Sequence, residues 1–123
     1  MGMGFSNLPT KKASDALRLA SVLVSRRGHC KGTIRNPDDE SVSATGAVLS
    51  ACGIPWASLT DDEEEMFNLL PQSNRSHALL ALECLEASVD DLYAWEDSPS
   101  VRTSHVVKLL IDCADRLAIV THK

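Results

Sequence analysis

The sequence contains few aromatic residues, with two Trp, one Tyr and two Phe among 123 residues. Sheet cores draw heavily on aromatic and β-branched side chains, whereas Ala and Leu favour helices. A core filled mainly by Ala, Leu and Val therefore favours close-packed helices over a β-sandwich. A chain of this length is expected to form one domain with a core that needs no covalent crosslinks.

The sequence also lacks an uninterrupted apolar stretch of the roughly 20 residues that a membrane-spanning helix requires. Its first residues, Met1-Gly2-Met3-Gly4-Phe5, have neither the basic region nor the apolar length of a secretory signal. We therefore expect a cytoplasmic protein that does not associate with membranes. Residues 1–10 are expected to be a flexible tail, and residues 11–120 a single helical domain.

Cysteines are few and widely spaced, and no Cys-x-x-Cys pair occurs. Zinc sites and redox motifs usually place such residues closer together. Three of the four cysteines lie in apolar helical stretches, where a free thiol behaves as a small apolar side chain. Unpaired core thiols are therefore expected, with disulfides or a metal site as weaker alternatives. We expect neither a metal nor a cofactor. The cysteines are Cys30, Cys52, Cys84 and Cys113.

The motifs of several common enzyme classes are absent. There is no glycine-rich phosphate loop, no Gly-x-Ser-x-Gly and no His-Glu-x-x-His. Cys30 follows His29, and a cysteine nucleophile can meet a distant histidine in the fold. However, four cysteines and four histidines make such a match easy to obtain by chance. We expect the protein not to be an enzyme, and a Cys-dependent enzyme is the less favoured alternative.

The charge that is present is unevenly distributed. Residues 1–35 carry seven basic residues and one acidic residue, whereas residues 36–98 carry one basic and fourteen acidic residues. Either the two regions neutralise each other within the fold, or they form patches that bind a charged partner or a second copy of the chain. The candidate basic patch comprises Lys11, Lys12, Arg26, Arg27, Lys31 and Arg35.

A basic patch of this kind can contact nucleic-acid phosphates, which makes a nucleic-acid-associated protein an alternative function. Two features disfavour it. The sequence pI is about 5.2, and no aromatic residue for base stacking occurs between residues 6 and 55. Nucleic acid is therefore not the expected partner.

Apolar residues recur with helical spacing in several stretches, separated by Gly, Pro and Asp turn signals. The expected class is an all-α, compact array of about five short helices, with a short extended segment compatible with residues 30–36. Residues 88–93 are expected to add a further helical turn, followed by a turn over 96–99. The helices are expected over residues 11–27, 42–52, 61–70, 75–87 and 104–119.

Several residues are expected to begin these helices or to shape their packing. Ser41 or Ser43 can cap the second helix, a capping box starts with Thr60, and Thr103 can cap the last helix. Gly46 lies within the second helix, where glycine costs about 1 kcal/mol relative to Ala. We therefore expect Gly46 to permit close contact with another helix.

The order of these signals resembles an uncharacterised family of small helical proteins found in actinobacteria and their phages, including mycobacteriophages. The matching segments are Arg27-Gly28 with Gly32, Gly46-Ala47-Val48-Leu49, Trp95-Glu96-Asp97 with Thr103, and the apolar last helix. The sequence departs from the family pattern at His29 and at Ser43-Ala44-Thr45. The resemblance implies a bacterial or phage protein of the cytosol, and implies no known enzymatic activity.

The candidate interaction residues are Tyr93, Trp95, Asp97 and Trp56. Aromatic side chains beside acidic residues are typical anchors of protein interfaces. In the alternative interpretation, Trp95 fills the gap between the last two helices and Asp97 accepts hydrogen bonds from nearby turn or helix amides. We expect a non-enzymatic protein that acts on a host protein, or on a second copy of itself, through protein–protein contact.

Overall fold

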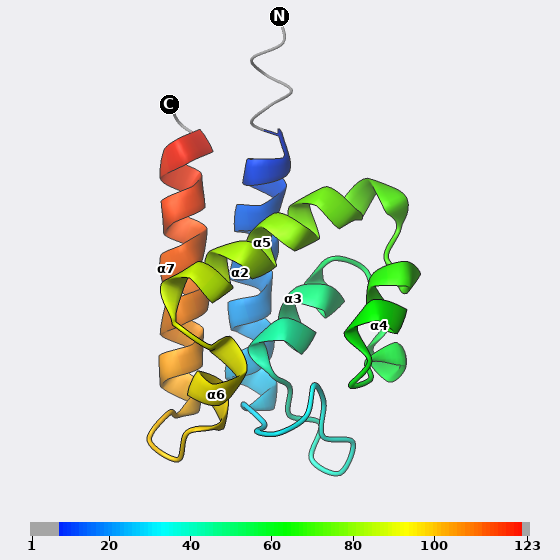
Figure 1. Cartoon of the computed structure of the whole chain (residues 1–123), viewed down its shortest axis with the longest axis vertical. Helices are drawn as coiled ribbons and strands as arrows, with labels where there is room; N and C mark the ends of the chain where they lie inside the picture. Colours follow the sequence, from blue (N-terminus) through cyan, green and yellow to red (C-terminus); the bar gives the residue numbers. More distant parts are fainter. Residues whose placement is uncertain (1–7, 122–123) are drawn as a thin grey trace, which may run out of the picture.

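A computed structural model describes residues 8–121 of the chain and has the expected all-α architecture (Figure 1). Six α-helices and two 3-10 turns form its regular elements in that range. The helices are α2 (Leu8–Arg27), α3 (Ala44–Ala51), α4 (Glu63–Leu69), α5 (Arg75–Ser88), α6 (Leu92–Asp97) and α7 (Thr103–Thr121), and the turns are η1 (Trp56–Ser58) and η2 (Gln72–Asn74).

The first helix begins earlier than the sequence suggested. Residues 8–10, assigned above to a tail, form the first turn of α2, and residues 1–7 of that tail lie outside the described residues. Within residues 8–121, no helix combines the length and apolar character needed to cross a membrane.

The two long helices, α2 and α7, form the centre of the fold. They lie side by side and run in opposite directions (Figure 1). The hydroxyl of Ser14 donates to the Ala114 carbonyl at 2.8 Å inside this contact, and Arg18 pairs with Asp115 at its surface. Their facing side chains are small or aliphatic, which permits a close approach. The fully buried members are Ala13, Leu17, Ala20, Val24, Val106, Leu110, Cys113 and Ala114.

The shorter helices cover this pair. Helix α5 crosses in front of α2 and α7, and α3 packs between α2 and α5 (Figure 1). Helix α4 lies away from the central pair (Figure 1), and the buried side chains are Met66 in α4 and Leu92 and Glu96 in α6. The loops that join these short helices therefore meet on one side of the molecule, where the candidate site forms.

Residues 29–35, which lie between α2 and α3, form an extended segment that is not a strand. It makes isolated bridges from His29 and Arg35 to Val42, and the Ser43 amide donates to the Ile34 carbonyl at 2.9 Å. The expected extended segment thus pairs with the residues that precede α3. Gly28, with φ of 88°, ends α2 and turns the chain into this segment.

Gly46 permits a close contact, but the partner is not the helix expected from the sequence. A Cβ atom at this position would lie 2.7 Å from the Ile34 carbonyl oxygen. The neighbouring backbone therefore belongs to the extended segment. This segment lies directly on α3. The Ser43 hydroxyl, as expected, caps this helix by accepting from the Gly46 amide.

Three other local expectations were wrong. Asp62, rather than Thr60, caps α4, because the Asp62 carboxylate accepts from the Glu65 amide. Glu96 and Asp97, expected in a turn, belong to α6. Thr103 does not act as the helix cap, and its hydroxyl instead accepts from the His29 amide at 3.2 Å. The Asp62 cap is a local contact, whereas Thr103, Glu96 and Asp97 bind residues distant in the sequence.

The expectation of unpaired thiols is confirmed, since all four cysteines are free. Cys30, Cys52 and Cys113 are buried, and Cys84 is partly exposed. Burial raises the pKa of the Cys52 thiol to about 11. Cys52 therefore behaves as an apolar core residue that remains protonated at neutral pH.

Candidate functional site: an acidic cleft

A cleft of about 830 Å³ opens between the extended segment, the start of α4, and α6. Its lining combines carboxylates with one aromatic side chain, and contains no Lys or Arg among the described residues. We refer to it as the acidic cleft. Its carboxylates are Asp61, Asp62, Glu63, Glu96 and Asp97, and its aromatic side chain is that of Tyr93.

Glu96 is the buried carboxylate of the acidic cleft, with only 2% of its surface exposed. Its Oε1 atom accepts from the Ala44 amide at 2.7 Å and lies 2.8 Å from Nε2 of His29. Its Oε2 atom is buried and has no hydrogen-bond partner among residues 8–121. Glu96 therefore joins α6 to α3 and the extended segment with one oxygen and leaves the other unsatisfied.

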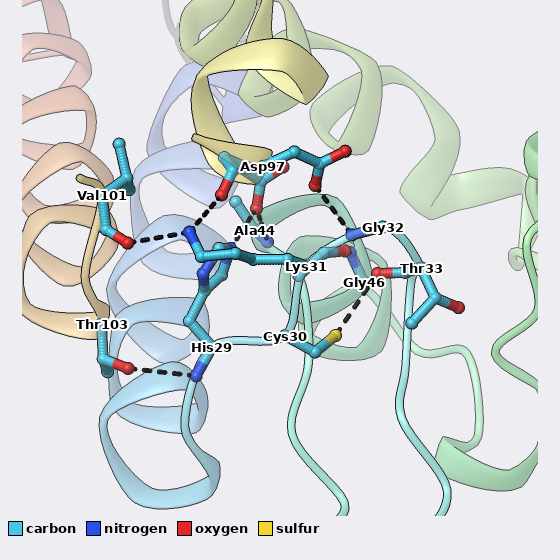
Figure 2. Close-up of polar contacts among 12 residues, drawn as sticks. His29, Cys30, Lys31, Gly32, Thr33, Ala44, Gly46, Asp97, Val101 and Thr103 are labelled. Atoms are coloured by element: carbon cyan, nitrogen blue, oxygen red, sulfur yellow. Dashed lines mark hydrogen bonds and ion pairs between the residues drawn. The ribbon is translucent and has the colours of Figure 1, made fainter. Parts of the chain in front are cut away.

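Lys31, in the extended segment, also connects this segment to α6. Its ammonium group donates to the carbonyls of Glu96, Ser98 and Val101 at 2.7, 2.7 and 2.8 Å (Figure 2). These carbonyls lie at or just beyond the end of α6, where backbone acceptors lack helical partners and a positive charge is favourable. Lys31 therefore uses its three donors inside the fold.

Two wall carboxylates are held by backbone amides of the extended segment. Asp97 Oδ1 accepts from the Gly32 amide at 2.7 Å (Figure 2). Asp61 Oδ1 accepts from the Ile34 amide at 2.8 Å and from the Thr33 hydroxyl at 2.7 Å. These two hydrogen bonds, led by the one from the Ile34 amide, lower the pKa of Asp61. Asp61 is therefore held as a carboxylate at neutral pH.

The remaining wall lies between α4 and α6. Asp62 Oδ1 is the cap of α4, and Glu63 Oε1 accepts from the Tyr93 hydroxyl. Burial, and then the hydrogen bond to Glu63, raise the pKa of Tyr93, although 44% of this residue is exposed. Each wall carboxylate is thus fixed through one oxygen, and the second oxygen can accept from a ligand.

The carboxylates are distributed along the cleft. Within residues 8–121, no three His, Cys, Asp or Glu side chains converge closely enough to hold a metal ion. A single small cation needs such convergence, whereas a chain of separated positive charges does not.

Cys30 lies in the same cleft without the surroundings of an activated nucleophile. Its thiol donates to the Thr33 carbonyl at 3.3 Å (Figure 2), and the ring of His29 contacts Glu96. Burial is the main cause that raises the pKa of Cys30, and the Glu96 carboxylate raises it further. A reactive cysteine requires a change of its pKa in the opposite direction.

The four predicted interaction residues do not form a single site in the structure. Tyr93 and Asp97 meet in the acidic cleft, but Asp97 accepts from Gly32 rather than from the turn or helix amides that we expected. Trp95 is half-buried beside a separate shallow hollow formed with Val101 and His105. Trp56 is also half-buried, and the Arg27 guanidinium lies 3.8 Å from the centre of its ring.

The predicted basic patch is spread over the fold. Lys11 and Lys12 lie near the start of α2, and Arg26 and Arg27 lie at its end, which is about 22 Å away at 1.5 Å per residue. Arg27 also lies 3.7 Å from Glu40, in addition to its contact with Trp56. Lys31 is engaged at the end of α6, and the Arg35 guanidinium lies 5.8 Å from the Trp56 ring centre.

Sequence reasoning missed most of the acidic cleft. The acidic residues that follow Thr60 were expected only as the start of a helix, and Glu96 was expected in a turn. A signal was available in the concentration of acidic residues in two short runs, 61–65 and 96–97. Nothing in their spacing indicated that both runs meet the segment that begins at His29.

The fold and the cleft together define a small all-α domain with an acidic cleft. A family model described as a family of unknown function, DUF6197, matches residues 8–116. The chain therefore belongs to the DUF6197 family, which confirms the expectation of an uncharacterised family. No curated protein and no solved structure matches the chain.

Proposed function

We propose that this protein is a non-enzymatic binding protein that acts through protein–protein contact. Its acidic cleft receives a segment of a partner protein that carries Lys or Arg side chains. The observation that carries the proposal is the row of carboxylates, each already held through one oxygen by the protein. Fixed acceptors lose little conformational freedom when a ligand binds, so more of the interaction energy contributes to affinity.

Tyr93 supports a cationic side chain as the ligand. An ammonium or guanidinium group interacts favourably with the face of an aromatic ring, and adjacent carboxylates complete its hydrogen bonds. Tyr93 is 44% exposed, and its hydroxyl is anchored on Glu63, so the ring is oriented beside the acidic wall. The candidate residues Tyr93 and Asp97 acquire a common role in this proposal.

The free oxygen of Glu96 supports an occupant that reaches the inner end of the cleft. A buried carboxylate oxygen without a partner is costly, and a donor that reaches it recovers part of that cost. A cationic side chain supplies both the donor and the opposite charge. The volume of about 830 Å³ is sufficient for several side chains of an extended peptide.

The test is a calorimetric titration of a short oligo-arginine peptide into the protein at moderate salt. Amide substitutions remove the charges yet preserve the acceptor oxygens that each carboxylate uses within the protein. We expect the triple variant to bind about tenfold more weakly, the loss expected for three partly exposed charge contacts. The variant carries Asp62→Asn, Glu63→Gln and Asp97→Asn.

A matched control removes the same number of acidic charges from exposed positions outside the acidic cleft. We expect this control to retain wild-type affinity within about twofold, because distant exposed charges are screened by salt. Equal losses in both variants, or no binding to the wild-type protein, would contradict the proposal. The control carries Asp38→Asn, Glu86→Gln and Asp90→Asn.

We also propose that the chain is a bacterial or phage protein that works in the cytoplasm, on a host protein in the phage case. The support is the resemblance described above, together with four free cysteines, which suit a reducing compartment. A second copy of the chain is the alternative partner, because exposed Lys11, Lys12 and Arg26 provide complementary charge. Light scattering at moderate salt distinguishes a homo-oligomer from a monomer that awaits another partner.

A further inference from the structure

Two free cysteines, neither of which lines the acidic cleft, meet across the contact between α5 and α7. The Cys84 thiol lies 3.9 Å from the Cys113 carbonyl, and the Cys113 thiol lies 3.6 Å from the Cys84 carbonyl. Each thiol therefore points across the helix contact toward the backbone of the other cysteine. This reciprocal arrangement brings both the sulfur atoms and the two backbones close together.

The surroundings of the two sulfur atoms differ. Cys113 Sγ lies 3.1 Å from the Arg116 guanidinium and 3.3 Å from the Ser88 hydroxyl. Arg116 also donates to Ser88, so charge and donors gather around Cys113. Burial, and then the neighbouring Cys113 thiol, raise the pKa of Cys84 to about 11. Cys113 therefore has a cation and a hydroxyl beside its sulfur atom, and Cys84 remains a neutral thiol.

We infer that Cys113 and Cys84 form a peroxide-sensitive dithiol, in which Cys113 is oxidised first and Cys84 then closes a disulfide between α7 and α5. The arrangement places a sulfur near a positive charge across a helix contact from a second cysteine, a pairing that redox-sensing cysteines also use. The inference is independent of the acidic cleft and of the proposed function.

The chemistry uses a small peroxide as the oxidant. The Cys113 thiolate attacks one peroxide oxygen, the O–O bond breaks, and the sulfur becomes a sulfenic acid while the second oxygen leaves as water after taking a proton. The Cys84 sulfur then attacks the sulfenic sulfur, the S–S bond forms, and the sulfenic oxygen leaves as a second water. Two thiols lose two electrons and two protons, and the peroxide is reduced to two molecules of water.

Access to the pair is from the surface beside α5. Cys113 is fully buried, but Cys84 and Ser88 are partly exposed, and Arg116 is exposed. Arg116, which lies against the Cys113 sulfur, is the exposed side chain that separates this sulfur from solvent, so the proposed oxidant is a small peroxide. Helix α7 also packs along α2, so a disulfide to α5 would fix three helices to one another.

The experiment treats the full-length folded protein with hydrogen peroxide, blocks the remaining thiols with an alkylating reagent, and maps the products by mass spectrometry. We expect a species lighter by two hydrogen atoms, with Cys84 linked to Cys113 and with Cys30 and Cys52 alkylated after unfolding. A Cys30→Ser, Cys52→Ser variant keeps the pair and should give the same crosslink. Four alkylated cysteines after peroxide treatment, or a crosslink that includes Cys30 or Cys52, would overturn the inference.

Two variants test the order of the steps. Cys84→Ser should stop the reaction at a sulfenic acid on Cys113, which a sulfenic-acid-specific reagent detects. Arg116→Gln should slow the crosslink severalfold, because it removes the positive charge that lies 3.1 Å from the Cys113 sulfur. A sulfenic acid on Cys84 in a Cys113→Ser variant at a similar rate, or an unchanged rate in Arg116→Gln, would contradict the assigned roles.

Discussion

Glu96 is the residue on which the candidate site depends most. Its single engaged oxygen contacts the Ala44 amide and the His29 ring, and the side chains of Glu96 and His29 are 3% and 2% exposed. A buried carboxylate with these contacts fixes the distance between α6, α3 and the extended segment. Residues of α6 and of the extended segment also line the acidic cleft.

Replacing Glu96 by Ala should lower the free energy of unfolding by about 3 kcal/mol, because it leaves a buried amide and a buried imidazole without their acceptor. Chemical denaturation measured by circular dichroism provides the value. Glu86→Ala removes an exposed acid from α5 and should change stability by less than about 0.5 kcal/mol. A Glu96→Ala variant as stable as the control would show that this junction does not hold the fold.

Asp61 gives the site a defined pH dependence. Its pKa in the folded protein is lowered from 3.8 by the Ile34 amide and the Thr33 hydroxyl. A lowered folded-state pKa contributes stability above the unfolded value, and that stability is lost as the pH falls through the folded value. The wild-type protein should therefore exceed Asp61→Asn in stability at neutral pH, and the difference should shrink below about pH 4.

Thermal unfolding of wild-type protein and Asp61→Asn at a series of pH values measures this difference. Asp38→Asn, which removes a charge from an exposed turn, serves as the control and should have little effect at neutral pH. If the difference in stability between wild-type protein and Asp61→Asn stayed constant down to pH 2, the Ile34 amide would not be stabilising the ionised form of Asp61.

Residue identities in the site were only partly predictable from the sequence. Tyr93 and Asp97 were selected because an aromatic residue near acids suits an interface, and both line the cleft. Lys31 was assigned to a basic patch because sequence shows its charge but not the three carbonyls that its ammonium group meets. Sequence proximity similarly suggested Thr60 as the cap of α4, although Asp62 fills that role.

At the scale of elements, the extended segment between α2 and α3 organises the acidic cleft. It supplies amides to Asp97 and Asp61, and its Lys31 side chain binds the end of α6. The end of α6 and the residues just before α4 are thus aligned by polar contacts to this one segment. Rigid acceptors in the cleft depend on this segment remaining in place.

Lys31→Met tests this dependence. Met retains most of the apolar chain but leaves three carbonyls without a charged donor, so we expect a loss of about 2 kcal/mol in the free energy of unfolding. Amide hydrogen exchange should also become faster at Gly32 and Ser98 than at Leu17 in the central helix pair. Lys11→Met, at an exposed position on α2, is the control and should change neither property.

The helices themselves followed well from periodicity, because a buried apolar face leaves a clear 3.6-residue pattern in α2, α5 and α7. The short α6 was only partly predicted, since its last turn is polar and its free carbonyls are satisfied by distant Lys31. The cleft could not be predicted, because residues near 31, 61 and 96 approach one another only after α3 and α5 have packed.

Over the whole molecule, the acidic residues are more concentrated in space than the basic residues. The acidic regions around Asp61 and Asp97 meet in one cleft, whereas the basic residues of α2 lie at both of its ends. The molecule therefore carries a concentrated negative site and dispersed positive charge. Such a distribution steers a basic partner toward one face and weakens as salt increases.

The most direct measurement is a nuclear magnetic resonance titration of the labelled protein with the oligo-arginine peptide. The amides of Gly32, Ile34 and Glu65 donate to carboxylates of the acidic cleft, so their signals report occupancy of its walls. We predict saturable shifts that centre on these amides and diminish with salt. Shifts centred elsewhere, or none that saturate, would contradict the proposal that the acidic cleft binds a cationic segment.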